Sequence, residues 1–385
     1  MKRKISRIQL KYQKYRFKYS SIKSGLKIIL FLIQNCLNII LLHINLFNSL
    51  IKREISGNCV LFIEPPQQGY GDLFFQTPIF ELLKKSGYQV QILCQAGHCD
   101  ILKNNQNINK ILFWNKRDLL LIFKTNYKFI ICLGRDKLKT NLLLLIKFFT
   151  PKYILDSNLK IWRQYFKDYN TPIAWQKLFY YFNKKTNYYN LPKIYFSQTE
   201  LEQIQKIRKE NQFPIIGLII GVTNKLKEYP HWNLIINQLG DTNYSIFLLG
   251  VNNNLNFDVG QSNIIDLTRH SNYRDAILYM AACDIVIGAE GSLIHIASSF
   301  NKKIIVLEGS DNFYKNSFLK PNGNITILSA HTCKLWINSN SNLKMRHCFL
   351  DNFGKIRRGA NQCLANINSL TIKKTIDCVL KNLNY

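Results

Sequence analysis

From residue 58 onwards, short apolar runs alternate with stretches of helical periodicity. In the first half of this region, helices are expected at Phe74–Ser86, ending near Gly87, and at Leu138–Phe149, ending before Pro151. The expected strands are Cys59–Ile63, Gln89–Cys94, Lys110–Phe113, Phe129–Leu133 and Tyr153–Leu155. Regular alternation of strands and helices predicts a parallel sheet whose strands are joined by crossover helices.

The second half repeats this alternation beyond a boundary near Gln212–Pro214. Its strands are expected at Ile215–Ile220, Ser245–Leu249, Ile264–Leu267, Ile285–Ile287, Lys303–Leu307 and Ile325–Leu328. Its helices are expected at Leu201–Asn211, His231–Leu239, Tyr273–Cys283 and Leu293–Phe300. We therefore predict an α/β protein with two Rossmann-like, doubly wound domains, at residues 58–200 and 201–385. Ligands of such folds bind at the carboxyl ends of the strands, so a cleft between the domains is the expected site.

The first 57 residues follow a different pattern. Residues 1–53 carry 12 Lys and Arg side chains and no Asp or Glu. Between Ile28 and Ile51 the chain is mostly apolar, but Gln34 and Asn38 fall on one face of a helix. A basic amphipathic helix of this kind is typical of segments that lie on anionic membranes. We interpret residues 1–57 as a membrane-associating leader; a single span and a helix packed on the protein itself are the alternatives.

The amino-acid composition gives only limited information about the binding partners of the protein. The chain has 52 Lys and Arg against 23 Asp and Glu, and the formal charge of +29 favours anionic partners. The general abundance of lysine and asparagine weakens that inference. A hydrophobic content of 47% excludes a disordered or fibrous protein. Among ten cysteines, Cys59, Cys94, Cys132 and Cys283 fall in apolar patterns, and no cleavable signal is evident, which favours a reducing cytosol.

The first segment with candidate chemistry lies between an expected strand and the helix that follows it. Gly69 and Gly71 allow a tight turn in which the backbone approaches a ligand closely. Asp72 would then lie at the start of the helix, in the cleft; an ordinary helix-capping aspartate is the alternative. The spacing differs from G-x-G-x-x-G and P-loop patterns, so neither a nicotinamide site nor a Walker site is predicted.

Two further segments lie in the second half. In residues 223–232, Thr223 and Lys227 follow an apolar strand and could hold a diphosphate, unless the segment is only a solvated loop. A glycine-rich turn then connects a strand to a helix, where backbone N–H groups would face an anion. In that turn Glu290 could accept hydrogen bonds from ribose or sugar hydroxyls. His295 is either a ligand contact or a buried core residue.

In order and spacing, these segments resemble glycosyltransferase family 9, the heptosyltransferases of lipopolysaccharide core assembly. The family's first motif, a Gly-Asp pair followed by an apolar stretch and then threonine and proline, corresponds to Gly71–Pro78. Its lysine-x-aromatic-proline motif corresponds to Lys227–Pro230. Its last motif, usually Asp-Ser/Thr-Gly-x-x-His-x-Ala, corresponds to Glu290–Ala297. The resemblance covers roughly residues 58–380.

The resemblance implies a two-domain GT-B fold and inverting, metal-independent sugar transfer without a cofactor. The donor would be a nucleotide sugar, typically ADP-heptose, and the acceptor an anionic glycolipid such as lipopolysaccharide core. Asp72 would be the general base, on an acceptor-side loop with Gly69 and Gly71, and Lys227 would neutralise the leaving diphosphate. The implied donor-binding residues are Thr223, Lys227, Glu290, Gly291, Ser292, Leu293 and His295. Residues 1–53 would hold the enzyme peripherally at the cytoplasmic face of the inner membrane, with no specific nucleic-acid partner.

The chain departs from the family pattern at several positions. Glu290 replaces the usual Asp, the order of Gly291 and Ser292 is inverted, and Tyr229 stands where a tryptophan is common. These changes leave the nucleotide base and the sugar open. Some relatives carry a metal-binding cysteine cluster near the C-terminus, but here the C-x-x-C spacing is missing, so no metal site is predicted. The cysteines of that region are Cys333, Cys348, Cys363 and Cys378, the last expected in the core.

Two other functions fit the same patterns. One is a nucleotide-sugar epimerase of the same architecture, which would act on the donor without an acceptor. The other is a non-catalytic binder of anionic lipid or nucleic acid, for which the order of the three motifs would be coincidental.

Overall fold

The computed structural model describes residues 54–64, 69–132, 142, 153–156, 191–221, 227–250, 263–268, 272–309, 324–329 and 362–383. Residues 1–53 of the predicted leader lie outside these residues, as do Thr223, Cys333, Cys348 and almost all of the helix expected at 138–149. Residues 54–57, which the prediction assigned to the leader, instead form the start of the first strand. In the described part of the chain, no helix combines the length and the hydropathy needed to cross a membrane.

The first lobe is built on a five-stranded parallel sheet with the order β3-β2-β1-β4-β5. Its strands are β1 (Glu54–Ile63), β2 (Gln89–Cys94), β3 (Lys110–Phe113), β4 (Thr125–Cys132) and β5 (Tyr153–Asp156). Its helices are α2 (Tyr70–Lys85), α3 (Cys99–Leu102) and α4 (Lys116–Lys124). The central strand is buried on both faces, as expected for a parallel sheet: Val60 pairs with Val90 and Phe129, and residues 59–63 are fully buried.

The second lobe has a six-stranded parallel sheet with the order β11-β10-β9-β6-β7-β8. Its strands are β6 (Ile215–Ile219), β7 (Ser245–Leu249), β8 (Ile264–Asp266), β9 (Ile285–Ala289), β10 (Lys303–Glu308) and β11 (Ile325–Ser329). Its helices are α8 (Gln198–Glu210), α9 (Trp232–Gly240), α10 (Tyr273–Ala282), α11 (Ser292–Ala297), α14 (Gln362–Ala365) and α15 (Ser369–Lys381). The two predicted doubly wound sheets are thus confirmed, and the predicted boundary between residues 200 and 201 falls inside α8.

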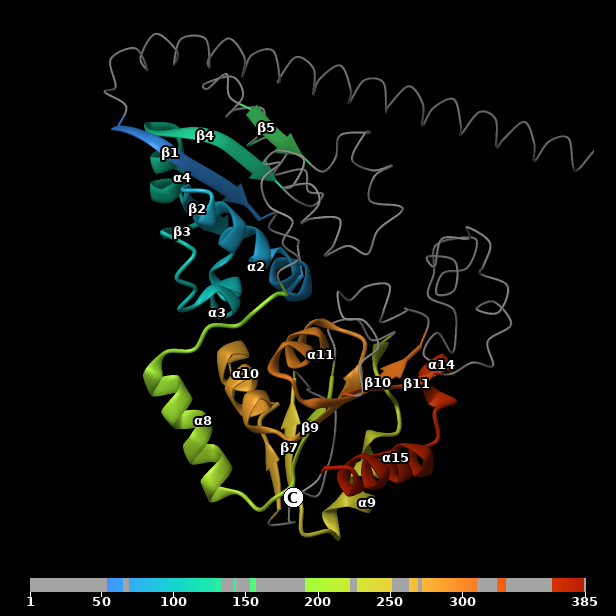
Figure 1. The fold of residues 1–385 in the computed structure, drawn as a ribbon. Helices are drawn as coiled ribbons and strands as arrows, with labels where there is room; N and C mark the ends of the chain where they lie inside the picture. The colour runs from blue at the N-terminus through green and yellow to red at the C-terminus, as the bar shows by residue number, and fades with distance from the viewer. Residues whose placement is uncertain are drawn as a thin grey trace, which may run out of the picture.

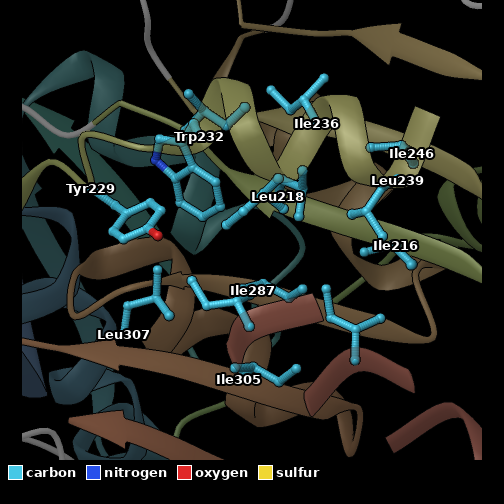
Figure 2. Close-up of a cluster of buried hydrophobic side chains, with 14 of the residues drawn as sticks. Ile216, Leu218, Tyr229, Trp232, Ile236, Leu239, Ile246, Ile287, Ile305 and Leu307 are labelled. Carbon is cyan, nitrogen blue, oxygen red and sulfur yellow. The ribbon is translucent and has the colours of Figure 1, made fainter. Parts of the chain in front are cut away.

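Alternate residues of β6 enter different hydrophobic clusters on the two faces of the second sheet. Ile215 and Ile219 pack in the cluster that includes α10 and α11, whereas Ile216 and Leu218 pack in the cluster that includes α9 and α15. Figure 1 shows α10 and α11 toward the first lobe, and α9 and α15 at the opposite end of the second lobe. Figure 2 shows part of the α9 cluster.

Helix α2 begins earlier than the sequence pattern predicts. Gly69 is its N-cap and Tyr70 its first residue, so Gly71 lies in the helix and not in a tight turn before Phe74. The helix also continues through Pro78, which lacks the N–H that would bond the carbonyl one turn earlier. The Thr77 hydroxyl donates to that carbonyl, Phe74 O, at 2.8 Å. This local replacement explains why the proline does not end the helix.

The two lobes share a hydrophobic cluster. Phe74 and Phe75 of α2 and Ile101 of α3 are buried together with Leu293 and Ile294 of α11. The start of α2 therefore lies directly against α11, which carries the last of the three sequence motifs.

Gly288 is the penultimate residue of β9, and its lack of a side chain is a packing requirement. A Cβ at this position would lie 2.8 Å from Ile219 Cβ. We expect Gly288→Ala to reduce the free energy of unfolding by about 1–3 kcal/mol, because the neighbouring strand must move. Urea denaturation measures this directly, and an unchanged midpoint would contradict the prediction.

The cysteines bear out one expectation and correct another. Cys59, Cys94, Cys132 and Cys283 are buried thiols, as predicted. Cys378, expected in the core, is exposed on α15. This helix buries Ile372 and Ile376, and Cys378 lies about 200° around the axis from the latter. The apolar pattern of residues 369–381 predicts a helix, but it does not show which side of that helix faces the sheet.

Candidate active site

Asp72 is the third residue of α2 and is exposed to solvent. The backbone N–H of Gly69 donates to its Oδ2 at 3.4 Å. Asp72 is therefore not the N-cap residue itself; its carboxylate reaches back to the cap from the first turn. The long contact to Gly69 leaves the carboxylate able to accept a proton from another group on its solvent side.

Gly71 allows a close approach between the first turn of α2 and the second lobe. A Cβ at Gly71 would lie 3.4 Å from both Cα and Cβ of Ser292, the first residue of α11. One turn later, the ring of Phe75 meets His295 edge-on, with ring centroids 4.8 Å apart. The first turn of α2, which carries Asp72, is thus packed onto the start of α11.

Lys227, Glu290 and His295 form a hydrogen-bonded group in the second lobe, in which Glu290 and His295 are buried and Lys227 is partly exposed. Lys227 Nζ donates to Glu290 Oε2, and His295 Nε2 lies 3.0 Å from Glu290 Oε1. Burial alone would raise the pKa of Glu290, but the hydrogen bonds and charges of His295 and Lys227 outweigh burial and lower the pKa to about 2. Glu290 is therefore ionised at neutral pH and holds both partners in place.

Lys227 owes its position to aromatic residues that follow it. Tyr229 and Trp232 are 1% and 2% exposed, and their rings meet at 78° with centroids 5.2 Å apart. The Tyr229 hydroxyl donates to Ile367 O at 2.8 Å. Figure 2 shows both rings beside Leu218 and Ile287 of the sheet. The part of this segment that the structure describes is thus an anchored connection and not a freely solvated loop.

The charged groups of the two lobes act on one another. Although Asp72 is accessible to solvent, the protein packed around it removes part of the water from its carboxylate and so raises its pKa. The charge of Glu290 adds to the increase, while the Gly69 N–H, His295 and Lys227 oppose it. A carboxylate with a raised pKa is a stronger base than an ordinary aspartate. The structure therefore brings Asp72 of the first lobe to the same junction as Lys227, Glu290 and His295 of the second.

The other predicted site residues have different surroundings. Gly291 is the N-cap of α11 in extended backbone, and Leu293 has its side chain in the shared hydrophobic cluster, which leaves its backbone for a ligand. His295 is 3% exposed and bonded to Glu290, so it is a buried partner and not an open contact. Among the described residues, no group of three or more His, Cys, Asp or Glu side chains is arranged to hold a metal ion.

Sequence reasoning missed a second buried acid at this junction. Glu64 follows β1 and is fully buried, and it accepts a hydrogen bond from Nδ1 of His98, 34 residues away. The ring of Tyr70 packs on His98. No motif links these positions; the one available signal was an acidic residue placed directly after the apolar run Cys59–Ile63.

Comparison with known proteins agrees with this geometry. The sequence profile described as glycosyltransferase family 9 (heptosyltransferase) matches residues 125–342, more than half of the chain. No curated protein sequence matches the chain.

Solved structures show the same fold at low sequence identity. A family 9 glycosyltransferase from Veillonella parvula is 14% identical with a TM-score of 0.61, over 85% of this chain and 98% of its own. The ADP-heptose LPS heptosyltransferase II of E. coli is 15% identical with a TM-score of 0.61, over 83% and 98%. The iron-containing dodecameric glycosyltransferase TibC of enterotoxigenic E. coli is 12% identical with a TM-score of 0.53, over 86% and 78%.

The profile match spans the two motifs of the second lobe, and the GT-B-like arrangement of the two sheets agrees with it. The chain belongs to glycosyltransferase family 9 and is a heptosyltransferase-like glycosyltransferase.

Proposed function

We propose that the enzyme transfers heptose from ADP-heptose to a lipopolysaccharide core or a related surface glycan, with inversion and without a metal ion. The observation that supports this most directly is the packing of the start of α2, which carries Asp72, against the start of α11, whose His295 is bonded to Glu290. The E. coli ADP-heptose LPS heptosyltransferase II, which has the same fold, supports the choice of donor and acceptor.

In the proposed reaction, Asp72 accepts the proton of an acceptor hydroxyl. The hydroxyl oxygen attacks the anomeric carbon of the donor sugar from the side opposite the nucleotide, and the bond between that carbon and the diphosphate oxygen breaks. The electron pair leaves with the nucleoside diphosphate, whose growing negative charge Lys227 stabilises. Glu290 orients Lys227 and offers oxygen atoms to donor hydroxyls, with His295 holding the carboxylate from behind.

The acceptor and the location of the enzyme are part of the same proposal. An anionic glycolipid would suit the formal charge of +29 and the basic stretch at residues 1–53. The enzyme would then work peripherally at the cytoplasmic face of the inner membrane.

A binding and transfer experiment tests the function. The purified full chain is titrated with ADP, UDP and GDP by calorimetry and then incubated with ADP-heptose, with and without core lipopolysaccharide. We expect selective ADP binding and sugar transfer only when the acceptor is present. Conversion of the donor without acceptor would favour an epimerase, and salt-dependent nucleic-acid binding without nucleotide binding would favour a non-catalytic binder.

Lys227→Ala separates the proposed donor role from general stability. We expect kcat/KM for the donor to fall about 100-fold, with weaker ADP binding, because one cation facing the leaving diphosphate is lost. Lys206→Ala is the matched control, since that lysine is 72% exposed and paired with Glu210 on α8. Steady-state kinetics and calorimetry measure both effects, and wild-type ADP affinity in Lys227→Ala would contradict the assignment.

A further inference from the structure

An aromatic stack bridges the two lobes beside the candidate base. The ring of Tyr70, the first residue of α2, lies between His98 of the first lobe and Tyr273, the first residue of α10. The Tyr70 and His98 ring centroids are 4.2 Å apart, and the Tyr70 and Tyr273 rings stack at 3.9 Å with an angle of 18°. We call these three residues the Tyr70 stack.

The first-lobe end of the stack is held rigidly. Glu64 is fully buried, and its Oε1 accepts from His98 Nδ1 while its Oε2 accepts from the backbone N–H of Gln95 at 3.3 Å. His98 is 6% exposed. The turn beside it is equally close: a Cβ at Gly97 would lie 3.0 Å from the Tyr70 hydroxyl oxygen. Tyr70 therefore has little room to change its position.

The second-lobe end of the stack leads to the family's last motif. The Tyr273 hydroxyl donates to Ser292 Oγ at 3.0 Å, and Ser292 is the residue against which Gly71 packs. Tyr70 precedes Gly71 and Asp72 directly. The orientation of the first turn of α2, and with it the Asp72 carboxylate, is thus set from both lobes through one ring.

We propose that Glu64 and His98 are positioning residues for sugar transfer: they fix Tyr70, and Tyr70 fixes Asp72 relative to Ser292. The inference rests on the proposed role of Asp72 as base. It assigns no contact with substrate to Glu64 or His98, which are buried. Burying an acid–imidazole pair costs desolvation free energy, whereas apolar residues of similar size would support the helix without that cost. Support of the helix alone therefore does not account for the pair.

The main test is His98→Ala in the full chain, assayed with ADP-heptose and core lipopolysaccharide. We expect kcat to fall about 30- to 100-fold while the donor KM and the ADP affinity stay within twofold, because misplacing a catalytic group by about 1 Å has effects of this size. Tyr88→Ala is the control, since Tyr88 and Phe129 form a T-shaped ring pair at 5.0 Å in the same lobe. It should lower the melting temperature without lowering kcat.

Gly97→Ala provides a second variant that leaves no buried charge without its partner. The added methyl group presses on the Tyr70 hydroxyl and should displace it by a few tenths of an ångström. Because a displacement of about 1 Å is expected to lower kcat about 30- to 100-fold, we expect this smaller one to lower kcat about three- to tenfold. Combining Gly97→Ala with Tyr70→Phe removes the contacted oxygen, so the part of kcat lost through the added methyl group should be recovered. A merely structural role for the stack predicts no such rescue.

Amide hydrogen exchange tests whether the Tyr70 stack positions α2 without relying on the sugar-transfer assay. In His98→Ala the amides of residues 70–75 should exchange faster, while those of α9 should not change, whether or not transfer is observed. If wild-type enzyme transfers no sugar, the function fails and the exchange result still decides whether the stack positions α2. A kcat within twofold of wild type, unchanged exchange, or a loss of ADP affinity matching the loss of kcat would each overturn the inference.

Discussion

Asp72→Asn is expected to lower kcat about 1000-fold, within the range that a positioned general base contributes. The amide keeps the shape of the side chain and still accepts from Gly69 N–H, so the fold and ADP affinity should be retained. In the wild type, kcat/KM should rise with pH as the base loses its proton, through a pKa above the usual 3.8 because Asp72 is desolvated. The residual activity of Asp72→Asn should lack that rise.

Asp118→Asn is the matched control for this variant. Asp118 also lies in the first turn of a helix, α4, where its Oδ2 accepts from Phe113 N–H at 2.8 Å and from Asn115 Nδ2 at 3.1 Å. Asp118→Asn should destabilise the start of α4 about as much as Asp72→Asn destabilises the start of α2, while leaving kcat unchanged. Turnover by Asp72→Asn within tenfold of wild type would remove Asp72 from the reaction, and equal losses in both variants would point to folding.

Arg274→Met is expected to reduce the free energy of unfolding by about 3–5 kcal/mol, because it leaves a buried carboxylate without its main partner. Arg274 is 3% exposed and donates to both carboxylate oxygens of Glu200, at 3.0 and 2.8 Å. It also donates to Asp100 O in α3 at 2.9 Å and to Tyr195 O in the connecting segment at 2.6 Å. One side chain of α10 therefore joins both lobes and the chain between them.

The pH dependence of unfolding identifies the carboxylate involved. Burial tends to raise the pKa of Glu200, but Arg274, the Ser197 N–H and Lys103 lower it to about 2. Because this pKa lies below the ordinary 4.5, the contribution is present above pH 4.5 and is lost as the pH falls toward about 2. The expected loss in Arg274→Met should accordingly be larger at pH 7 than at pH 3, as measured by urea denaturation.

The double variant Arg274→Met/Glu200→Met controls for this interpretation. Replacing both partners removes the stranded charge, so much of the lost stability should return. A double variant no more stable than Arg274→Met would show that the loss arises from the backbone contacts to Asp100 and Tyr195, and not from the ion pair.

Most strands were predictable because buried parallel strands are continuous apolar runs, as in Ile215–Ile219. Helix α4 was not, because it passes directly into β4 at Thr125 with no glycine or proline between them. The start of α2 was misplaced for the opposite reason, since Gly69 and Gly71 suggest a turn. In the structure, Gly71 instead serves the contact with Ser292.

The site could be predicted only where it lies in short motifs. Asp72, Lys227 and Glu290 each stand beside a strand end and a helix start, so local sequence marks them. That Glu290 binds Lys227 depends on the pairing of β6 with β9, which are neighbours in the sheet although far apart in the chain. Its contact with His295 is made within the same motif, five residues along the chain. Glu64 and His98 have no motif at all, because their contact is made by the pairing of β1 with β2.

Drawing the lobes apart would strip Phe74, Phe75 and Ile101 from the cluster that they share with α11 and leave them in water. Each fully buried side chain of this size is worth about 1.5–3 kcal/mol. Any motion that admits a donor or releases spent nucleotide is therefore expected to pivot about this seam and keep it dry. The expected opening is therefore a rotation of one lobe about the contact of α2 and α3 with α11, and not a separation of the two lobes along their whole interface.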